Sequence, residues 1–209
     1  MIAGETLLLL PQKAVKWKDI LLIADLHLGK IGHFRRSGVA IPGNAVDHNT
    51  DRLIWLLDEN SPSKVVFLGD LFHSHYNSEW ESFRQIIENY PQIEFHLVQG
   101  NHDIMSKYRY LQPGIVLHEG TLYLEPFILS HEPVRDDSIP EGSYNLAGHI
   151  HPGVKLKGRG RQQLNLPCFY FNKKLGLLPA FGVFTGIHCL NTGSDDQVYV
   201  IADNLIYKK

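Results

Sequence analysis

Cysteine is scarce in this chain, which has only two among its 209 residues, Cys168 and Cys189. They form neither a CxxC metal motif nor a disulfide framework. Free thiols used this sparsely favour a reducing compartment, so a cytoplasmic location is expected.

Long hydrophobic runs and an excess of one charge are also lacking. The first apolar run, in MIAGETLLLLPQK, ends at Pro11 and follows no basic leader. It is too short for a signal core or a membrane span, so no membrane partner is expected. The net charge is −2 with histidine neutral. Nucleic acid or an anionic membrane would therefore have to be held by a local basic patch.

Histidine, in contrast, is abundant, and the hydrophobic content is sufficient for a substantial core. Hydrophobic residues make up 44% of the chain, and no repeat, low-complexity tract or linker interrupts it. We expect a single domain spanning residues 1–209, a length common among α/β folds. Twelve histidines, several of them clustered with acids and glycine, are a compositional sign of metal binding.

The first half of the chain alternates apolar runs with amphipathic segments. TLLLL and AVKW predict a hairpin, and the apolar run after it ends in DLH. The spacing of apolar residues predicts helices over residues 44–60 and 78–90. Each helix is followed by another apolar run, SKVVFLGD and IEFHLVQGNHD respectively. This order indicates parallel strands joined by crossover helices.

The second half contains shorter strands separated by turn residues, which predicts a second, more antiparallel sheet. The expected strands lie in TLYLEPFILSHEP, YNLAGHIHP, VKLKGRGRQQLNLPCFYFN, GVFTG and QVYVIADNLIYK. Two such sheets packed face to face give the expected fold, an α/β four-layer α/β/β/α sandwich of two mixed sheets flanked by helices.

Residues of metal-binding type follow five of the expected strands. They are Asp25, His27, Asp70, Asn101, His102, Asp103, His131, His149 and His151. Each alone can be a cap, a turn residue or a satisfied buried histidine. Because ligands bind beyond the carboxyl ends of strands in open α/β sheets, Asp25, Asp70 and Asn101 would meet at one edge, and two strands of the second sheet also end in histidines. A cluster so rich in carboxylates needs a cation to offset its self-repulsion, so a metal site is predicted.

The stretch LAGHIHPGV places two histidines, His149 and His151, two residues apart. In an extended chain both imidazoles would lie on the same face and point at one place. A half-exposed surface pair without a function is the alternative.

The blocks DLH, GD, GNHD, a single histidine after an apolar strand, and GHIH occur in the order and spacing that resemble the calcineurin-like metallophosphoesterases. This match spans Asp25 to His151. The segments FRRSGVAIP, GDLFHS, LPCF and LPAFGVFTG look like the bacterial ligase-associated DNA-damage-response metallophosphoesterases. The resemblance implies the metallo-dependent phosphatase fold and a metal-dependent phosphoesterase. One departure is His73, where many members carry Asp or Asn; it would contact substrate or simply pack.

The resemblance also implies a role for each candidate ligand. One divalent ion would be held by Asp25, His27, Asp70 and His151. The other would be held by Asp70, Asn101, His131 and His149. Two ions about 3.5–4 Å apart can clamp a phosphoryl group between them. Carboxylate, imidazole and amide ligands without thiolate favour manganese, with iron or zinc as alternatives.

Two catalytic roles are expected beside these ligands. His102 would protonate the leaving oxygen or donate a hydrogen bond to the phosphoryl group. Asp103 would orient His102, with a turn-forming aspartate as the simpler interpretation.

Two basic clusters leave the expected active edge and could reach phosphates flanking the scissile one. The first follows DLH and contains Lys30, Arg35 and Arg36. The second follows GHIH and contains Lys155, Lys157, Arg159 and Arg161. A solvated hairpin is the alternative for the second cluster.

The resulting hypothesis is a binuclear-metal-dependent phosphodiesterase that acts on nucleic acid. The subfamily resemblance implies a single-strand DNA endonuclease in DNA repair, associated with repair proteins such as a ligase and a helicase, or with further copies of itself. One alternative is a hydrolase of small phosphoesters or nucleotides. Another is a non-catalytic scaffold of the same fold, which the complete set of candidate ligands and His102 argues against.

Overall fold

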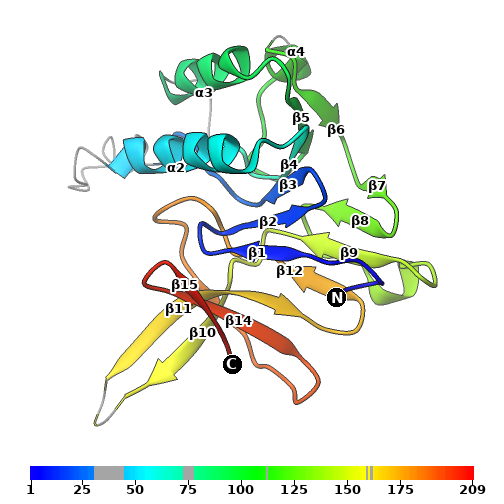
Figure 1. Cartoon of the computed structure of the whole chain (residues 1–209), viewed down its shortest axis with the longest axis vertical. Helices are drawn as coiled ribbons and strands as arrows, with labels where there is room; N and C mark the ends of the chain where they lie inside the picture. Colours follow the sequence, from blue (N-terminus) through cyan, green and yellow to red (C-terminus); the bar gives the residue numbers. More distant parts are fainter. Residues whose placement is uncertain (31–44, 73–77, 112, 159, 161) are drawn as a thin grey trace.

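The computed structural model describes residues 1–30, 45–72, 78–111, 113–158, 160 and 162–209 (Figure 1). It contains two β-sheets and a layer of helices. The predictions on Arg35, Arg36, His73, Arg159 and Arg161 lie outside the described residues.

The first sheet has six strands in the order in which they occur along the chain. They are β1 (Leu8–Leu10), β2 (Ala14–Trp17), β3 (Ile20–Ile23), β4 (Lys64–Leu68), β5 (Glu94–Val98) and β6 (Val116–His118). The expected hairpin is confirmed as β1 and β2, and β3 follows antiparallel to β2. The strands β3, β4 and β5 are parallel, as the apolar runs predict, and β6, which was not predicted, continues the parallel arrangement. The carboxyl ends of β3, β4 and β5 therefore lie at one edge.

Three α-helices cover the outer face of this sheet, α2 (Ala45–Asn60), α3 (Ser78–Asn89) and α4 (Lys107–Leu111). Residues two apart on each strand, such as Leu21 and Ile23, share a buried cluster with helix residues such as Leu57 and Phe83. Because side chains alternate along a strand, Leu22 and its counterparts on neighbouring strands lie on the opposite face, in a second buried cluster. Both predicted helices are confirmed to within a residue at each end.

The second sheet has nine strands in a mixed arrangement. They are β7 (Leu122–Leu124), β8 (Phe127–Ser130), β9 (Tyr144–Ala147), β10 (Pro152–Lys157), β11 (Gln163–Phe171), β12 (Leu175–Leu177), β13 (His188–Cys189), β14 (Gln197–Ala202) and β15 (Leu205–Lys208). A short 3-10 helix, η1 (Asp136–Ser138), precedes β9. Most pairings are antiparallel, but β8, β9 and β12 run parallel to one another. The ends of β8 and β9 therefore reach the same edge.

The two sheets pack face to face around a second buried cluster. Trp17 of the first sheet meets Phe127 of the second edge to face, with ring centroids 4.9 Å apart. The layers therefore run from helices through the first sheet to the second (Figure 1). The expectation of two mixed sheets in an α/β fold is confirmed, and the described α-helices all lie on the first sheet. None of these helices has the length and apolar character needed to span a membrane.

One expected strand is wrong. GVFTG, residues 182–186, forms a turn in which Phe184 and Gly186 have φ of 60° and 80°. Positive φ values cannot continue a β-strand, so the alternating pattern did not determine the structure here.

Candidate metal centre

The candidate ligands follow strands of both sheets. Asp25 and Asp70 come directly after β3 and β4, and Asn101 follows β5. From the second sheet, His131 follows β8, and His149 comes shortly after β9. The main-chain N–H of His149 donates to Oδ2 of Asp25 at 2.9 Å, and Nε2 of His131 lies 3.4 Å from Oδ1 of Asp70. The structure therefore joins residues more than sixty positions apart at one edge.

Five of these residues have left-handed backbone conformations. They are Asp25, His27, Asp70, His149 and His151, with φ between 49° and 64°. Non-glycine residues rarely adopt this region, and such residues concentrate at functional sites. The conformation recurs in the loops that follow β3, β4 and β9.

The glycines of the motifs are required by close approach. A Cβ atom on Gly100 would lie 2.3 Å from the main-chain nitrogen of Asp70, and one on Gly148 would lie 2.7 Å from Oδ2 of Asp25. These distances are far shorter than ordinary van der Waals contacts, so a side chain would displace the carboxylates. The glycines of GNHD and GHIH thus let the loops close around the two acids.

Two overlapping groups of donor atoms are close enough to hold metal ions. One contains Asp25, His27 and His151, and the other Asp25, Asp70 and His131; within each, the donor atoms lie within 4.8 Å of one another. Nε2 of His151 lies 3.4 Å from Oδ1 of Asp25, and Nε2 of His27 lies 3.7 Å from Oδ2 of Asp70. All of these residues except His151 are buried.

The two histidines of GHIH face different groups. The ring of His149 meets that of His131 with centroids 4.8 Å apart, whereas the ring of His151 meets that of His27 at 5.4 Å. The expectation of an extended chain at this point is wrong, because both residues have positive φ and lie beyond the end of β9. The backbone turns at each histidine.

Main-chain carbonyl groups orient two of the histidine rings by hydrogen bonding. Nδ1 of His131 lies 3.0 Å from the carbonyl oxygen of Leu68, and Nδ1 of His151 lies 3.0 Å from that of Thr185. A carbonyl oxygen only accepts, so each Nδ1 carries a proton and each Nε2 is left as a potential metal donor. This is the usual arrangement around metal-binding histidines.

The donor set fits a divalent cation. Oδ1 of Asp25 is buried and accepts no hydrogen bond among the described residues. A buried carboxylate oxygen without a donor is costly, and Asp70 adds a second carboxylate that is only 3% exposed. A cation between them would satisfy the oxygen and offset the repulsion. Oxygen and imidazole donors without thiolate suit manganese, iron or zinc.

Asn101 lies at the exposed rim of the centre. Its Nδ2 donates to Oε1 of Glu132 at 2.9 Å, so its amide oxygen is not used in this bond. The same bond lowers the pKa of Glu132, with the nearby His149 adding to the effect. Glu132 was missed in the sequence, although it directly follows His131.

His102 is exposed, and its main-chain N–H donates to Oδ1 of Asp70 at 2.9 Å. Its ring lies edge to face with that of His27, with centroids 5.5 Å apart. Asp103, in contrast, is fully buried and accepts the main-chain N–H groups of Phe72 and Gly100. Burial raises the pKa of Asp103 to about 7 despite these bonds. The contacts of Asp103 match the turn-forming interpretation.

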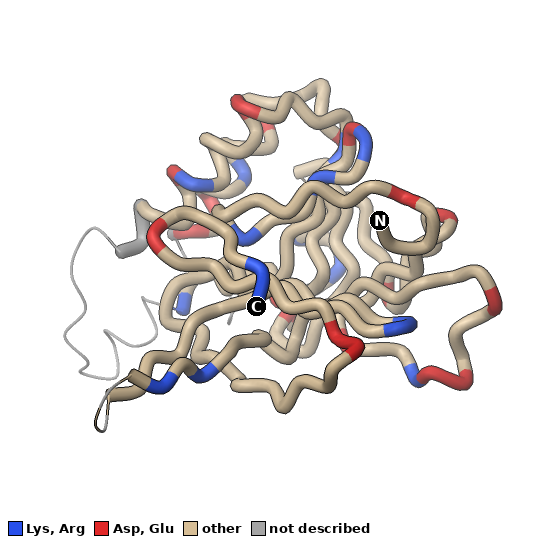
Figure 2. The backbone as a smooth tube through the Cα atoms, turned by 60° about the horizontal axis from the view of Figure 1, so that its bottom comes forward, with Lys and Arg blue, Asp and Glu red and all other residues tan. Residues whose placement is uncertain are grey.

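Of the predicted substrate-binding residues, Lys155 and Lys157 are described and exposed on β10. In the β10–β11 hairpin they pair with Asn165 and Gln163, so these four polar residues share one face. Leu156 and its partner on β11 occupy the opposite face. The hairpin projects beyond the sandwich, with basic positions near its tip (Figure 2).

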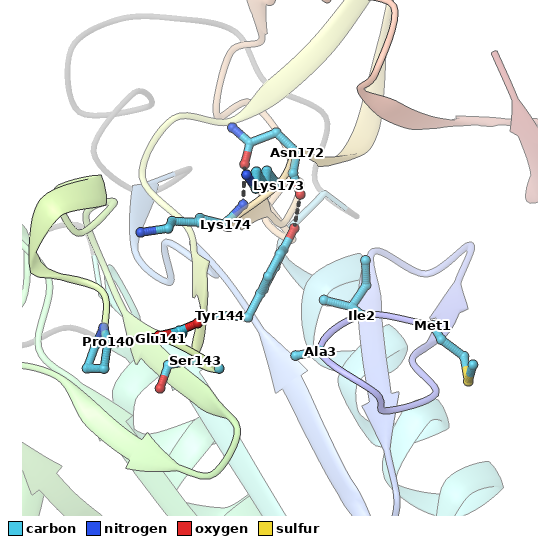
Figure 3. A pocket seen from close by; sticks show the side chains of 11 residues that line it. Met1, Ile2, Ala3, Pro140, Glu141, Ser143, Tyr144, Asn172, Lys173 and Lys174 are labelled. Atoms are coloured by element: carbon cyan, nitrogen blue, oxygen red, sulfur yellow. Dashed lines mark hydrogen bonds between the residues drawn. The ribbon is translucent and has the colours of Figure 1, made fainter.

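Two cavities flank different parts of the second sheet. One of about 320 Å³ borders Asn101, His131 and Glu132 at the metal centre. A larger one of about 680 Å³ is lined by Ile2, Tyr144 and other residues of the N-terminus, residues 140–144 and residues 172–174 (Figure 3). Since Tyr144 begins β9 and His149 follows its end, the larger cavity lies at the opposite edge from the metal centre.

The chain belongs to the calcineurin-like phosphoesterase family, whose model matches residues 18–193. It is a metal-dependent phosphoesterase of the metallo-dependent phosphatase fold. Among solved structures, the Pseudomonas putida nuclease MPE matches with a TM-score of 0.80 and 27% identity, covering 100% of this chain and 97% of that one. The E. coli phosphoesterase Yfce matches with a TM-score of 0.45 and 14% identity, covering 90% of each chain. No curated protein gives a significant match.

Proposed function

We propose that this chain is a binuclear-metal-dependent phosphodiesterase that cleaves nucleic acid, with single-stranded DNA as its substrate. The observation that carries the proposal is the pair of overlapping donor groups that share Asp25, next to the strand from which the basic hairpin extends. Similarity over the whole length to a nuclease supports the choice of nucleic acid.

In this proposal the two ions share Asp70, whose Oδ2 lies 3.7 Å from Nε2 of His27 and whose Oδ1 lies 3.4 Å from Nε2 of His131. Asp25, His27 and His151 complete one position, and Asn101, His131 and His149 complete the other. The bound ions would polarise the phosphoryl oxygens. They would also lower the pKa of a bound water molecule, so that it can act as a nucleophile at neutral pH. Manganese is the proposed ion, because the donors are oxygen and imidazole nitrogen without thiolate.

The protein's own residues position the substrate and transfer a proton to it. His102 is held by its main-chain bond to Asp70 while its side chain remains exposed, so it can approach a substrate oxygen. We assign to His102 the protonation of the leaving oxygen. Asp103 supports the turn that carries His102 through its bonds to Phe72 and Gly100.

The polar face of the hairpin supplies the proposed contacts to the DNA backbone. Lys155 and Lys157 point from the same face, with the cross-strand partners Asn165 and Gln163 beside them. Their positive charges are local, in a chain with a net charge of −2, so they would bind phosphates close to the scissile one. Arg35, Arg36, His73, Arg159 and Arg161 belong to this proposal as further substrate contacts.

The cellular part of the proposal is a role in DNA repair in the cytoplasm, beside a ligase and a helicase. The deciding experiment is biochemical. Metal-free protein is loaded with manganese, iron or zinc and assayed on single-stranded DNA, duplex DNA, a nitrophenyl diester and a nitrophenyl monoester. Cleavage of single-stranded DNA in preference to duplex supports the proposal. Hydrolysis of the monoester and nucleotides without DNA cleavage would replace it with the small-phosphoester function.

A further inference from the structure

The segment from Ala180 to Gly186 lies against the loop that carries the DLH motif. Ala180 forms a parallel bridge with Ala24. The main-chain N–H of Phe181 donates to the carbonyl oxygen of Ala24 at 2.8 Å, and that of Gly182 donates to that of Asp25 at 3.0 Å. A Cβ atom on Gly182 would lie 2.5 Å from the carbonyl oxygen of Leu26. This support segment, residues 180–186, therefore fixes the backbone of Asp25.

The same segment also orients a histidine from the second sheet. The carbonyl oxygen of Thr185 accepts from Nδ1 of His151 at 3.0 Å, so Nε2 of His151 faces Oδ1 of Asp25. Oγ1 of Thr185 donates to the carbonyl oxygen of Gly182 at 3.3 Å, which closes the turn. Asp25 and His151, two donors of one proposed ion, thus depend on a single turn.

Helix α2 holds this turn from outside through Arg52. Nη2 of Arg52 donates to the carbonyl oxygen of Phe181 and, at 3.2 Å, to Oδ1 of Asn49. The guanidinium also lies over the Phe181 ring, with Cζ 4.0 Å from its centroid. Oδ1 of Asn49, in turn, accepts the main-chain N–H of Val183 at 3.3 Å. Three contacts from one helix turn therefore converge on the support segment.

The charge of Arg52 has no acidic partner among the described residues. Burial lowers the pKa of its guanidinium to about 10, so it still carries a proton at neutral pH. A half-buried cation without a carboxylate is costly for stability. This cost is consistent with a role for the planar guanidinium, which can stack on a ring and donate two bonds at once.

We infer that Arg52 is a positioning residue for the metal centre, acting through the support segment on Asp25 and His151. Its assigned role is to hold the support segment, not to bind an ion or the substrate. The inference rests on the proposed function only in taking Asp25 and His151 as ligands of one ion. Loss of Arg52 would let the turn shift and would weaken that ion's site more than the other.

The test measures metal binding to the metal-free full-length protein, by calorimetric titration with manganese and by counting bound ions. Arg52→Ala should weaken one of the two binding steps by about 10–100-fold, the usual effect of removing an outer partner of a ligand. The other step should change little. Arg52→Lys keeps the charge but not the planar fork, so it should restore only part of the affinity. Arg84→Ala removes a half-buried arginine of α3 that pairs with Glu81 and Glu88, and it is the matched control.

A second variant keeps the test decisive if Arg52→Ala fails to fold. Phe181→Leu retains the carbonyl oxygen and removes the stacked ring, so it should weaken the same binding step by a smaller factor. A merely structural role would lower the unfolding temperature of the metal-free protein and leave both affinities unchanged. That result in folded Arg52→Lys and Phe181→Leu proteins overturns the inference. If Asp25→Ala itself leaves both affinities intact, the metal assignment fails instead.

Discussion

Nδ1 of His149 lies 3.1 Å from Nε2 of His131, although the two residues follow different strands of the second sheet. Two nitrogen ligands about 2 Å from one ion and at right angles to each other would lie about 3 Å apart. The pair therefore has the spacing of neighbouring donors on a single ion. Asp70 approaches the same point through Oδ1, 3.4 Å from Nε2 of His131.

Removing the shared carboxylate tests the number of ions. We expect Asp70→Ala to lower the bound metal from about two ions per chain and to abolish phosphodiesterase activity, since both positions use Asp70. The protein should remain folded. Metal content measured after dialysis, with Asp51→Ala on the exposed face of α2 as control, checks the prediction. An intact protein that is fully active with one ion argues against the binuclear centre.

His102→Ala should separate proton transfer from metal binding. On DNA, whose leaving group is poor, turnover should fall by about 10²–10⁴-fold. On a nitrophenyl diester the loss should be much smaller, because nitrophenolate leaves without protonation. Metal content should match that of the unmodified protein. Equal losses on the two substrates would instead assign His102 to substrate positioning.

The hairpin can be tested with a matched pair of double variants. Lys155→Gln with Lys157→Gln should weaken DNA cleavage and flatten its dependence on salt, because fewer counterions are released. Hydrolysis of a small nitrophenyl diester should barely change. Lys173 and Lys174 line the larger cavity (Figure 3), so Lys173→Gln with Lys174→Gln removes the same charge far from the hairpin and should leave both activities unchanged. The measurement is kcat/KM on both substrates across a salt series.

The hairpin test extends to Arg159 and Arg161. Neutralising all four basic residues should enlarge the effect of the double variant. If the quadruple variant cuts DNA like the parent at every salt concentration, the hairpin is a solvated turn.

Gly100→Ala should weaken metal binding although it replaces no candidate ligand. The added Cβ would meet the main chain and carboxylate of Asp70, so overpacking should cost about 1–3 kcal/mol and reduce metal affinity. Gly120→Ala is the control, because nothing lies within 4 Å of its Cβ position. Urea unfolding and metal titration of both variants check this. Similar behaviour of the two variants would remove the steric explanation for GNHD.

The low pKa of Lys13 should make the free energy of unfolding depend on pH. Burial, with Arg52 nearby, lowers the pKa of Lys13 from 10.5 to about 8 in the folded protein. Below pH 8 the lysine is protonated in both states, and the full cost of burying the charge applies; the cost fades as pH rises toward 10.5. Lys13→Met should therefore raise the free energy of unfolding at pH 7, on the order of 2 kcal/mol, with little gain near pH 10.5.

Urea unfolding of both proteins across this pH range measures the difference. Lys173→Met, at an exposed position, is the control. A gain that is constant with pH would mean that packing, and not charge, is responsible.

Much of this centre could be predicted from the sequence because each strand is an apolar run that ends in a polar residue. Parallel pairing of β3, β4 and β5 then brings Asp25, Asp70 and Asn101 to one edge without further information. The crossover helices followed from their apolar spacing. The spacing of apolar residues and the order of the strands were therefore enough to predict the fold and the convergence of these three residues.

Contacts made through the main chain could not be predicted in this way. Thr185 orients His151 through a carbonyl oxygen, which every residue type possesses, so its side chain carries no signal. Arg52 meets Phe181 across more than a hundred residues, and no local pattern records that contact. The extended chain expected at His149 failed because positive φ depends on the surrounding packing rather than on residue type alone.

The donors are divided between the two sheets, with Asp25 and Asp70 on the first and His131 and His149 on the second. Each ion would therefore act as a further cross-link between the sheets, beside the hydrogen bonds that already join them at this edge, such as the one from His149 to Asp25. Its binding energy would add to the free energy that holds the sheets together along this edge. Away from this edge, apolar contacts such as that between Trp17 and Phe127 pack the sheets together. Removing the metal with a chelator would thus weaken the contact between the sheets at this edge and leave the rest of their interface packed.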